Sequence, residues 1–267
     1  MSKVFLITGA ASGIGLALSH RLLENGHQVC VCDINFESLH NLYKSYSSKQ
    51  ILIQKLDVRD FDNWQKTINQ VLMKWNKLDV LCNVAGVLKE NWVIDSSPQE
   101  VDLHFDINLK GTILGTQSVL QTMKAQGSGH IINIASLAAL SPVPGLSLYS
   151  ASKFAVRSYS IAAGMELAEL GISVTAICPD AVQTPMLDQQ KDKVQAALTF
   201  SGRRALTVDE VVDAIVNVAL VKKPLEIILP QMRGILAKLA NSFPSVAATQ
   251  MNTWRRKGIK QQLQEKK

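Results

Sequence analysis

Seven short apolar runs recur along the 267-residue chain, and longer segments with helical spacing separate them. Because these runs are apolar at nearly every position, they are typical of strands covered on both faces, as in a parallel sheet. The expected strands are residues 4–8, 28–32, 51–56, 78–82, 130–135, 172–177 and 225–229. The alternation of strand and helix predicts a three-layer α/β fold, in which a doubly wound parallel sheet has right-handed crossovers.

The expected helix ends carry residues that stabilise such ends. Gly26 and Gly171 each follow a helical segment, where glycine readily adopts the left-handed conformation of a C-cap. Ser97 and Thr207 each precede a helical segment and have a Glu three residues later, which is the capping-box pattern. These signals place helix boundaries between the expected strands.

The formal charge of +6 is concentrated near the C-terminus. Residues 231–267 hold eight Lys or Arg and one acidic residue, whereas residues 1–230 hold 20 basic and 21 acidic residues. We therefore predict a nearly neutral domain over 1–230, which contains both the cofactor and the substrate sites, and a basic C-terminal extension over 231–267. Since the domain is neutral, we expect no nucleic-acid partner.

The basic extension contains a segment with helical periodicity. Apolar residues recur at helical spacing over 234–243, and Pro244 should end that helix. Trp254 then precedes the basic run 255–257. Two interpretations remain open. Either the extension packs on the domain or on a dimer partner and exposes its charges, or it attaches weakly to an anionic membrane surface.

Cysteine and histidine residues give no sign of a metal site. The four cysteines are too few for a disulfide framework and lie in apolar strand-like runs, which favours reduced thiols and a cytoplasmic location. The five histidines are scattered, so we expect each to lie on the surface or beside a helix, without ligand spacing. The opening run KVFLITG is too short for a secretion signal, so no leader is expected.

A glycine-rich loop, TGAASGIG at residues 8–15, directly follows the first strand and opens into a helix. Gly9 permits a tight turn, Gly13 lets the backbone approach a pyrophosphate, and Gly15 allows the helix to pack closely on the strand. The start of the helix offers N–H groups and the positive end of its dipole to the phosphates. The placement of this loop predicts a dinucleotide site.

Asp33 ends the second strand, 18 residues beyond Gly15. A carboxylate at this position can accept hydrogen bonds from the adenosine ribose hydroxyls. It would repel a 2′-phosphate, and no basic residue adjoins it, so NAD(H) is favoured over NADP(H). The alternative is a solvated Asp that caps the following helix.

Small and polar residues also follow the third and fourth strands. Asp57 and Val58 would contact the adenine edge, and Asn83, Ala85 and Gly86 would line the adenosine side of the cleft. All of them lie at the carboxyl ends of expected strands, where open α/β sheets bind their ligands.

Tyr149 and Lys153 are four residues apart in an expected helix and therefore share one face. A lysine ammonium near the phenol would lower the pKa of Tyr149 from its usual value of about 10. Ser136 follows the fifth strand, 13 residues before Tyr149, so a loop can bring its hydroxyl to the same substrate oxygen.

Together these motifs make the chain resemble the short-chain dehydrogenase/reductase family, in its single-domain branch of about 250 residues. The matching residues follow the family's order across 3–229. They are TGAASGIG (8–15), Asp33, Asp57-Val58, NVAG (83–86), Asn108 in INLKGT, Ser136 in NIASLA, YSASK (149–153) and PDAVQTP (179–185). The resemblance implies a Rossmann-type sheet of about seven strands in the order 3-2-1-4-5-6-7.

The resemblance also implies the role of each residue. Tyr149 would be the general acid/base, Ser136 would polarise the substrate oxygen, and Lys153 would bind the nicotinamide ribose and tune Tyr149. Asn108 would hold a helix irregularity and an ordered water that relays protons. The implied cofactor-binding residues are Gly9, Ser12, Gly13, Ile14, Gly15, Asp33, Asp57, Val58, Asn83, Ala85, Gly86, Tyr149, Lys153, Pro179, Val182 and Thr184. The last two would hold the nicotinamide carboxamide.

The chain departs from the family pattern at three places. Val84 replaces the usual second Asn of its motif, and Asp180 replaces the usual Gly after the sixth strand. The sequence after 229 lacks the Asp-Gly-Gly of the family's tetramer contact. This puts the tetramer in doubt and leaves a homodimer, formed through the helices that begin near Asn108 and Tyr149.

Apolar residues dominate 137–147 and 186–204, the segments expected to surround the substrate. The candidate substrate contacts are Ser136, Leu137, Val143, Tyr149 and Met186. We expect an NAD(H)-dependent oxidoreductase that interconverts a secondary alcohol and a ketone or aldehyde on a hydrophobic small molecule. A non-catalytic dinucleotide-binding or interaction protein and an NADPH-dependent carbonyl reductase are the alternatives. The substrate's identity and the direction of reaction stay open.

Overall fold

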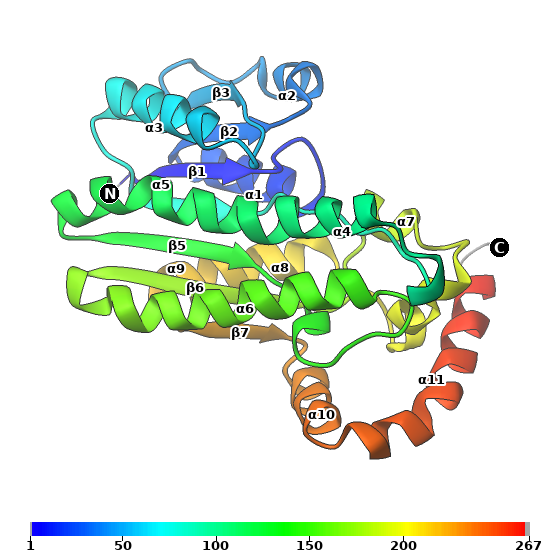
Figure 1. Ribbon diagram of the computed structural model, residues 1–267. Helices are drawn as coiled ribbons and strands as arrows, with labels where there is room; N and C mark the ends of the chain where they lie inside the picture. Colours follow the sequence, from blue (N-terminus) through cyan, green and yellow to red (C-terminus); the bar gives the residue numbers. More distant parts are fainter. Residues whose placement is uncertain (1, 265–267) are drawn as a thin grey trace.

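Seven parallel strands form one sheet in the computed structural model, which describes residues 2–264 (Figure 1). Their order across the sheet is β3-β2-β1-β4-β5-β6-β7. The strands are β1 (Val4–Thr8), β2 (Gln28–Asp33), β3 (Ile51–Lys55), β4 (Val80–Asn83), β5 (Gly129–Ile134), β6 (Ile172–Pro179) and β7 (Glu226–Leu229). The predicted doubly wound sheet and its strand order are confirmed.

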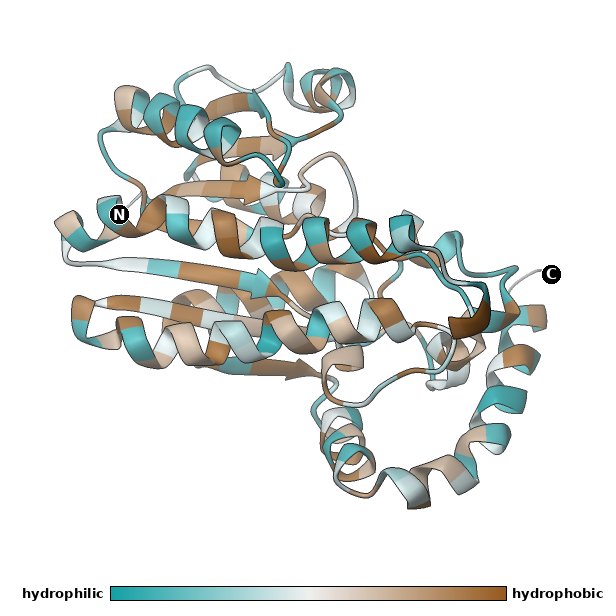
Figure 2. Cartoon of the chain, viewed as in Figure 1, coloured by the Kyte–Doolittle hydropathy of each residue, from teal (hydrophilic) through white to brown (hydrophobic). Residues whose placement is uncertain are grey.

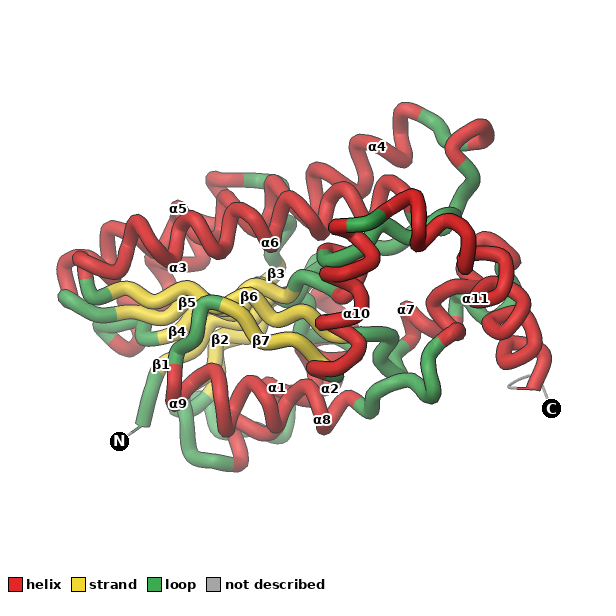
Figure 3. Tube along the Cα trace, turned by 90° about the horizontal axis from the view of Figure 1, so that it is seen from below, coloured by secondary structure: helices red, strands yellow, loops and turns green. Residues whose placement is uncertain are grey.

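Helices cover both faces of this sheet, so the molecule has three layers. Figure 3 shows α3, α5 and α6 on one side and α1, α2 and α8 on the other. The helices of the domain are α1 (Gly13–Glu24), α2 (Phe36–Tyr43), α3 (Phe61–Trp75), α4 (Pro98–His104), α5 (Gly111–Gln126), α6 (Ser147–Leu167), α7 (Pro185–Asp188), α8 (Val208–Ala214) and α9 (Leu220–Lys222).

Burial on both faces explains why the central strands are apolar throughout (Figure 2). Successive side chains of a strand point to opposite faces. Phe5 and Ile7 of β1 therefore pack in the cluster formed with α1 and α8, whereas Val4 and Leu6 pack in the cluster formed with α3 and α5. A continuous apolar strand such as β1 therefore contributes side chains to both hydrophobic cores.

The predicted strand over 78–82 begins later than expected, at Val80. The backbone N–H and C=O of Leu78 are hydrogen-bonded to the side-chain amide of Gln126, at 2.9 Å each, instead of to a neighbouring strand. A side chain 48 residues away has replaced the sheet ladder at this position.

The predicted helix ends are confirmed. Gly26 and Gly171 have φ values of 77° and 73°, in the left-handed region that favours glycine. Ser97 and Thr207 accept hydrogen bonds from the backbone of Glu100 and Glu210, whose side chains in turn bond the N-cap backbone. Both capping boxes are complete.

The C-terminal extension forms two helices, α10 (Gln231–Ser242) and α11 (Pro244–Gln264). Pro244 ends α10 as predicted, and it also begins α11. A proline is tolerated there because the first turn of a helix has no intrahelical partner for its N–H. Figure 1 shows the two helices arching away from the sheet and returning to the domain near α7.

The far end of the extension is packed against its own domain. A Cβ on Gly258 would lie 1.8 Å from the carbonyl oxygen of Ala197, so α11 approaches the 3-10 segment Val194–Ser201 as closely as a glycine allows. Gln262 donates to the carbonyls of Gln190 and Lys193 at 3.1 and 3.0 Å. Of the two interpretations of the extension, packing on the domain describes this end.

The basic run of the extension is only partly solvated. The guanidinium of Arg255 lies 4.6 Å from the ring centroid of Trp92, in a cation–π contact. Arg256 and Lys257 are exposed. Among the described residues, no helix has both the length and the apolar character that a membrane span requires.

Two histidines are buried, so the expectation that all five lie at the surface or beside a helix is wrong for His104 and His130. His130 lies in β5, and its Nε2 bonds the hydroxyl of Thr175 at 2.9 Å. Burial lowers the pKa of His130 to about 3, because a charged ring would lose its hydration inside the sheet. The ring is therefore held in its neutral form.

We predict that His130 makes the fold sensitive to acid. Below pH 6.5 the unfolded ring binds a proton, whereas the folded ring stays neutral to about pH 3. Stability present above pH 6.5 is therefore lost as the pH falls toward 3, by at most about 1.4 kcal/mol per unit. The Tm of the native protein should fall more steeply between pH 6.5 and 4 than that of His130→Gln. The exposed His40→Gln serves as the control, and equal slopes for native and His130→Gln would contradict the assignment.

Candidate active site

A cavity of about 880 Å³ lies at the carboxyl ends of the strands, where the sheet order reverses. It runs from Asp33 at the end of β2, past Gly86 after β4, to Thr184 after β6 and on to the extension. This volume is near the upper end of the range of about 300–1,000 Å³ that is usual for ligand sites. The cavity is therefore large enough for more than one ligand molecule.

The glycine loop forms the floor of one end of the cavity. Gly9 and Gly13 have φ values of 66° and 53°. A Cβ on Gly15 would lie 2.2 Å from the carbonyl oxygen of Gly9, so no side chain fits there. Ser12 is the N-cap of α1 but forms no side-chain capping bond, which leaves the first N–H groups of α1 without that partner. The loop therefore fits a pyrophosphate at a helix N-terminus.

Asp33 lines the cavity beside this loop. Its two carboxylate oxygens accept hydrogen bonds from the backbone N–H groups of Ala11 at 3.0 Å and Asn35 at 2.9 Å. Asn35, not Asp33, is the N-cap of α2, since its side chain accepts from the N–H of Ser38. The capping alternative for Asp33 is therefore wrong, and its remaining lone pairs fit ribose hydroxyls.

The adenine end holds a charged pair that the sequence reasoning missed. Asp57 and Val58 line the cavity, as does Arg59. The guanidinium of Arg59 donates to both oxygens of Asp57, at 2.9 and 2.7 Å, and holds the pKa of that carboxyl below its usual value. The sequence signal for this ion pair was the presence of opposite charges at positions 57 and 59.

Asn83 does not line the cavity, although it was expected on the adenosine side. Its side chain is buried, and its amide donates to the side-chain oxygen of Asn133 at 2.9 Å. Ala85 and Gly86, from the same motif, do line the cavity. Asn83 therefore links β4 to β5, and the chain turns toward the cavity only after it.

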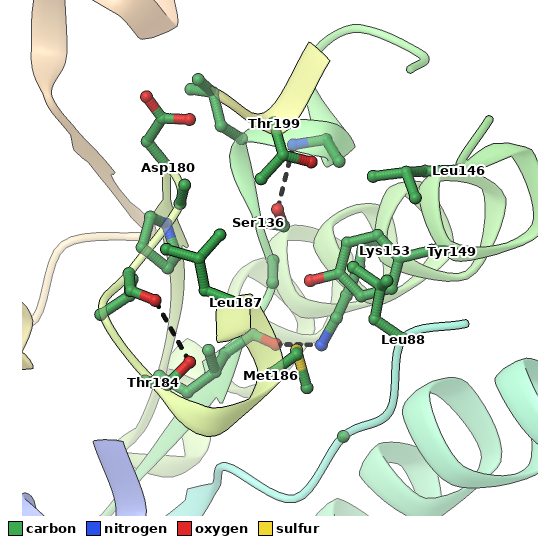
Figure 4. Close-up of a pocket in the computed structure, with 18 of the residues that line it drawn as sticks. Leu88, Ser136, Leu146, Tyr149, Lys153, Asp180, Thr184, Met186, Leu187 and Thr199 are labelled. Carbon is green, nitrogen blue, oxygen red and sulfur yellow. Dashed lines mark hydrogen bonds between the residues drawn. The ribbon is translucent and has the colours of Figure 1, made fainter. Parts of the chain in front are cut away.

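Tyr149, Lys153 and Ser136 are brought together at the centre of the cavity. In Figure 4 the Tyr149 oxygen and the Lys153 nitrogen point toward the side where Met186 and Leu187 lie, whereas the Ser136 oxygen points toward the N–H of Ala138. The Lys153 Nζ lies 5.7 Å from the Tyr149 ring centroid and donates to the carbonyl of Ile134 at 2.8 Å. The Ser136 hydroxyl accepts from the N–H of Ala138 at 3.1 Å.

Burial controls the protonation of this pair in the chain by itself. It raises the pKa of Tyr149 to about 12, against a smaller lowering by a hydrogen bond with Ser136. It lowers the pKa of Lys153 to about 8. The expectation that Lys153 lowers the pKa of Tyr149 is wrong for the chain alone, because desolvation raises that pKa.

Asn108 lies behind these residues and does not line the cavity. It is in a π-helical turn, Phe105–Lys110, as the expected helix irregularity requires. Its side chain accepts from the N–H of Val87 at 2.8 Å and donates to the carbonyl of Val87 and the hydroxyl of Ser152, both at 3.0 Å. Asn108 thus fixes the loop after β4 against α6.

Pro179, Val182 and Thr184 line the cavity beyond the glycine loop. The Thr184 hydroxyl donates to the carbonyl of Val182 at 3.2 Å. A Cβ on Gly13 would lie 3.1 Å from Thr184, so the loop after β6 touches the glycine loop. Together the two loops enclose a space between Asp33 and Lys153 that fits an extended dinucleotide.

The substrate end of the cavity is mostly apolar. The expected residues Leu137, Val143 and Met186 line it. Leu187 of the apolar segment 186–204 lines it as well. Further apolar residues that line it, which were not singled out, are Leu88, Leu146 and Leu198.

Side chains of the C-terminal extension also line the cavity, and the sequence reasoning missed them. They are Arg233, Leu236, Ala237, Ala240, Met251, Trp254 and Lys257.

An ion pair with Asp180 holds the start of the extension at the cavity. Its carboxylate lies 2.9 Å from the Arg233 guanidinium. Burial raises the pKa of Asp180, and the charge of Arg233 opposes that shift. An Asp at position 180 in place of the usual Gly was a signal that a cation lies nearby. Nothing in the sequence identified Arg233 as that cation.

His104 is a second buried group that was missed. It lies 6.5 Å from Tyr149 between ring centroids, edge to face. Its Nε2 accepts from the N–H of Lys89 at 3.1 Å, and its Nδ1 bonds the carbonyl of Glu100 at 2.7 Å. The edge of the buried His104 ring therefore lies beside Tyr149.

Comparison with known proteins shows the family of this chain. A family profile described as short chain dehydrogenase matches residues 3–195. The chain is 34% identical to 2-(R)-hydroxypropyl-CoM dehydrogenase of Xanthobacter autotrophicus over 82% of its own length and 92% of that protein. It is 34% identical to cyclopentanol dehydrogenase of Comamonas testosteroni over 75% of its own length and 81% of that protein.

Two solved structures resemble this chain in fold. A 3-ketoacyl-(acyl-carrier-protein) reductase from Brucella melitensis, complexed with NADH, superposes with a TM-score of 0.78 at 27% identity, covering 87% of this chain and 98% of that one. The structure titled ElxO with NADP bound superposes with a TM-score of 0.76 at 28% identity, covering 85% of this chain and 96% of that one.

The fold and the cavity define an oxidoreductase that uses a nicotinamide dinucleotide. The chain belongs to the short-chain dehydrogenase family, as the match over 3–195 and the relatives at 34% identity show.

Proposed function

We propose that the protein interconverts a secondary alcohol and a ketone or aldehyde on a hydrophobic small molecule, with NAD(H) as cofactor. The observation that carries this proposal is the convergence of Tyr149, Lys153 and Ser136 on one cavity whose outer walls are apolar. Dehydrogenases of cyclopentanol and of 2-(R)-hydroxypropyl-CoM among the relatives support an alcohol as the reacting group.

Each of the three residues has a distinct task. The nicotinamide cofactor, when bound, exchanges a hydride with the carbinol carbon. The Tyr149 oxygen takes the hydroxyl proton in oxidation and returns it in reduction. Lys153 binds the nicotinamide ribose, and its charge stabilises the phenolate. Ser136 donates a hydrogen bond to the substrate oxygen, which polarises a carbonyl in the reductive direction.

We predict that Tyr149→Phe lowers kcat for alcohol oxidation at least about 100-fold, because only the titrating oxygen is lost. Binding of NADH, followed by fluorescence, should stay nearly unchanged. Lys153→Met should impair both turnover and NADH binding. Tyr159→Phe removes a phenol oxygen from the same helix and serves as the control. Substantial turnover by Tyr149→Phe would show that proton transfer uses another group.

A non-catalytic dinucleotide-binding protein is the main alternative. Asn108, Ser136, Tyr149 and Lys153 are all present, and three of the four line the cavity. This arrangement favours an enzyme. An NADPH-dependent carbonyl reductase is the second alternative.

We infer that NAD(H) is preferred over NADP(H). Asp33 lines the cavity next to the glycine loop, and the nearby cation, Arg59, is paired with Asp57. A 2′-phosphate beside Asp33 would meet an uncompensated carboxylate. One similar structure holds NADP and another holds NADH, so the similar structures do not decide between the two cofactors. The inferred preference therefore rests on Asp33.

The preference predicts that NADH binds at least about tenfold more tightly than NADPH, or about 1.4 kcal/mol. Asp33→Ser should reduce this ratio, since the ribose hydrogen bonds and the repulsion disappear together. Glu37→Gln removes a charge from exposed α2 and controls for net charge. Fluorescence titration with both cofactors measures the ratio, and a native preference for NADPH would overturn the inference.

We propose further that the protein is a cytoplasmic homodimer. The described cysteines are all free and buried, which supports a reducing compartment. In Figure 1, α5 and α6 lie side by side over the same face of the sheet. Met165 of α6 is exposed there, so the pair offers a surface on which a second copy can pack.

The extension supports a weak attachment to an anionic membrane surface. Met232 and Leu239 of α10 and its C-cap residue Phe243 are exposed at helical spacing, and they do not line the cavity. Residues 231–264 contain no Asp or Glu, whereas Arg256 and Lys260 are exposed four residues apart on α11. Apolar side chains and basic charges together are the features that bind lipid headgroups.

Liposome co-sedimentation tests this attachment. Binding of the full chain to anionic vesicles should fall as salt rises, and Arg256→Gln/Lys260→Gln should weaken it by about 1 kcal/mol per residue. Lys44→Gln/Lys49→Gln, a pair of exposed lysines in and after the C-cap of α2, is the matched control. Equal, salt-insensitive recovery in the supernatant for all three proteins would leave only a packing role for the extension.

A further inference from the structure

One face of α10 is turned toward the catalytic cavity. Arg233, Leu236, Ala237 and Ala240 recur at the i, i+3, i+4 and i+7 spacing of a single helix face, and all four line the cavity. The exposed residues Met232 and Leu239 lie outside this set. The helix therefore has a cavity face that differs from its outer face.

The next helix of the extension contributes to the same wall. Met251 and Trp254, three residues apart on α11, also line the cavity. With Leu236, Ala237 and Ala240 they form a distal apolar wall, and we use this name for these five residues. Leu88, Leu146 and Met186 of the domain line the same cavity. Apolar side chains thus continue from Tyr149 outward to the extension.

The distal apolar wall is held in place by contacts at both of its ends. Arg233 pairs with Asp180 at 2.9 Å, and Lys238 pairs with Glu226 of β7 at 2.7 Å. At the other end, Gln262 bonds two backbone carbonyls of the domain. Because these contacts are all made within the chain, the wall does not need a ligand in order to form.

Two members of the wall retain a large exposed surface even though they face the cavity. Leu236 is 61% exposed and Trp254 is 40% exposed. A ligand that reaches from Tyr149 to these side chains would remove apolar surface from water on both partners, which favours binding. A small alcohol held at Tyr149 and Ser136 would leave that surface hydrated.

We infer that the distal apolar wall determines substrate specificity. On the assumption that the proposed function holds, it selects secondary alcohols and ketones that carry a long, uncharged apolar body beyond the reacting carbon. The reacting end is held by Tyr149 and Ser136, and the apolar body extends toward Leu236 and Trp254. The extension is then the part of the chain that sets the accepted length.

A series of 2-alkanols from 2-butanol to 2-decanol tests the inference. In the native protein kcat/KM with NAD should rise about threefold to fourfold per added methylene, the factor expected for burying one such group. The rise should end where the chain outgrows the wall. These probes are uncharged, so Lys257 and Arg203 at the cavity contribute little to the trend.

Two variants should change the length dependence in different ways. Ala240→Phe should lower kcat/KM for 2-decanol at least about tenfold more than for 2-butanol, because the new ring fills the distal space. Trp254→Ala should flatten the rise with chain length. The controls are Ala248→Phe, which is the same enlargement, and Leu263→Ala, which is a smaller truncation, at exposed α11 positions that do not line the cavity. Both controls should keep the native profile.

Binding of the corresponding 2-ketones to the NAD-loaded protein separates this inference from the proposed function. Ketones cannot be oxidised by NAD, so their Kd values report recognition alone. A Kd that is independent of chain length, or that changes equally in the variants and in their controls, overturns the role of the wall. A Kd that falls with chain length in a protein that turns over no alkanol supports the wall and overturns the proposed function.

Discussion

Burial of a parallel sheet on both faces is the constraint on which the rest of this structure depends. Strands covered on both sides must be apolar along their length, so polar chemistry is confined to their ends. All seven strands run in the same direction, and their carboxyl ends therefore meet along one edge. Asp33, Ser136 and Thr184 come from different strands and share one cavity for that reason. The glycine loop belongs to the same edge, where α1 begins beside β1.

Features that depend on neighbouring residues were predictable, and features that depend on distant ones were not. Strands and helix caps follow from local periodicity and from residues three or four apart, as the box at Ser97 and Glu100 shows. The start of β4 depends on Gln126, which no local sequence pattern indicates. The buried ring of His104 accepts a hydrogen bond from the backbone N–H of Lys89, which lies 15 residues away in the sequence. Motif order located Tyr149 and Lys153, but the sequence held no information about their desolvation.

Desolvation acts on both Tyr149 and Lys153. Burial raises the pKa of Tyr149 and lowers that of Lys153, so both shifts oppose charge in the chain alone. A phenolate at Tyr149 needs a positive charge that the protein does not fully supply. An oxidised nicotinamide is cationic, and a cofactor bound in the cavity would supply such a charge. Under the proposed function, burial of the pair would make proton transfer at Tyr149 depend on the bound cofactor.

The C-terminal extension and the change at Asp180 depend on each other. A carboxylate buried at the end of β6 would carry a large desolvation penalty without a cation, and Arg233 of α10 lies 2.9 Å away. In turn, Arg233 positions Leu236 and Ala240 over the cavity, because all three lie on one face of the helix. A glycine at 180 would leave the first turn of α10 without this partner. The departure from the family motif and the added apolar wall are therefore parts of one arrangement, which joins the substrate end of the cavity to the extension.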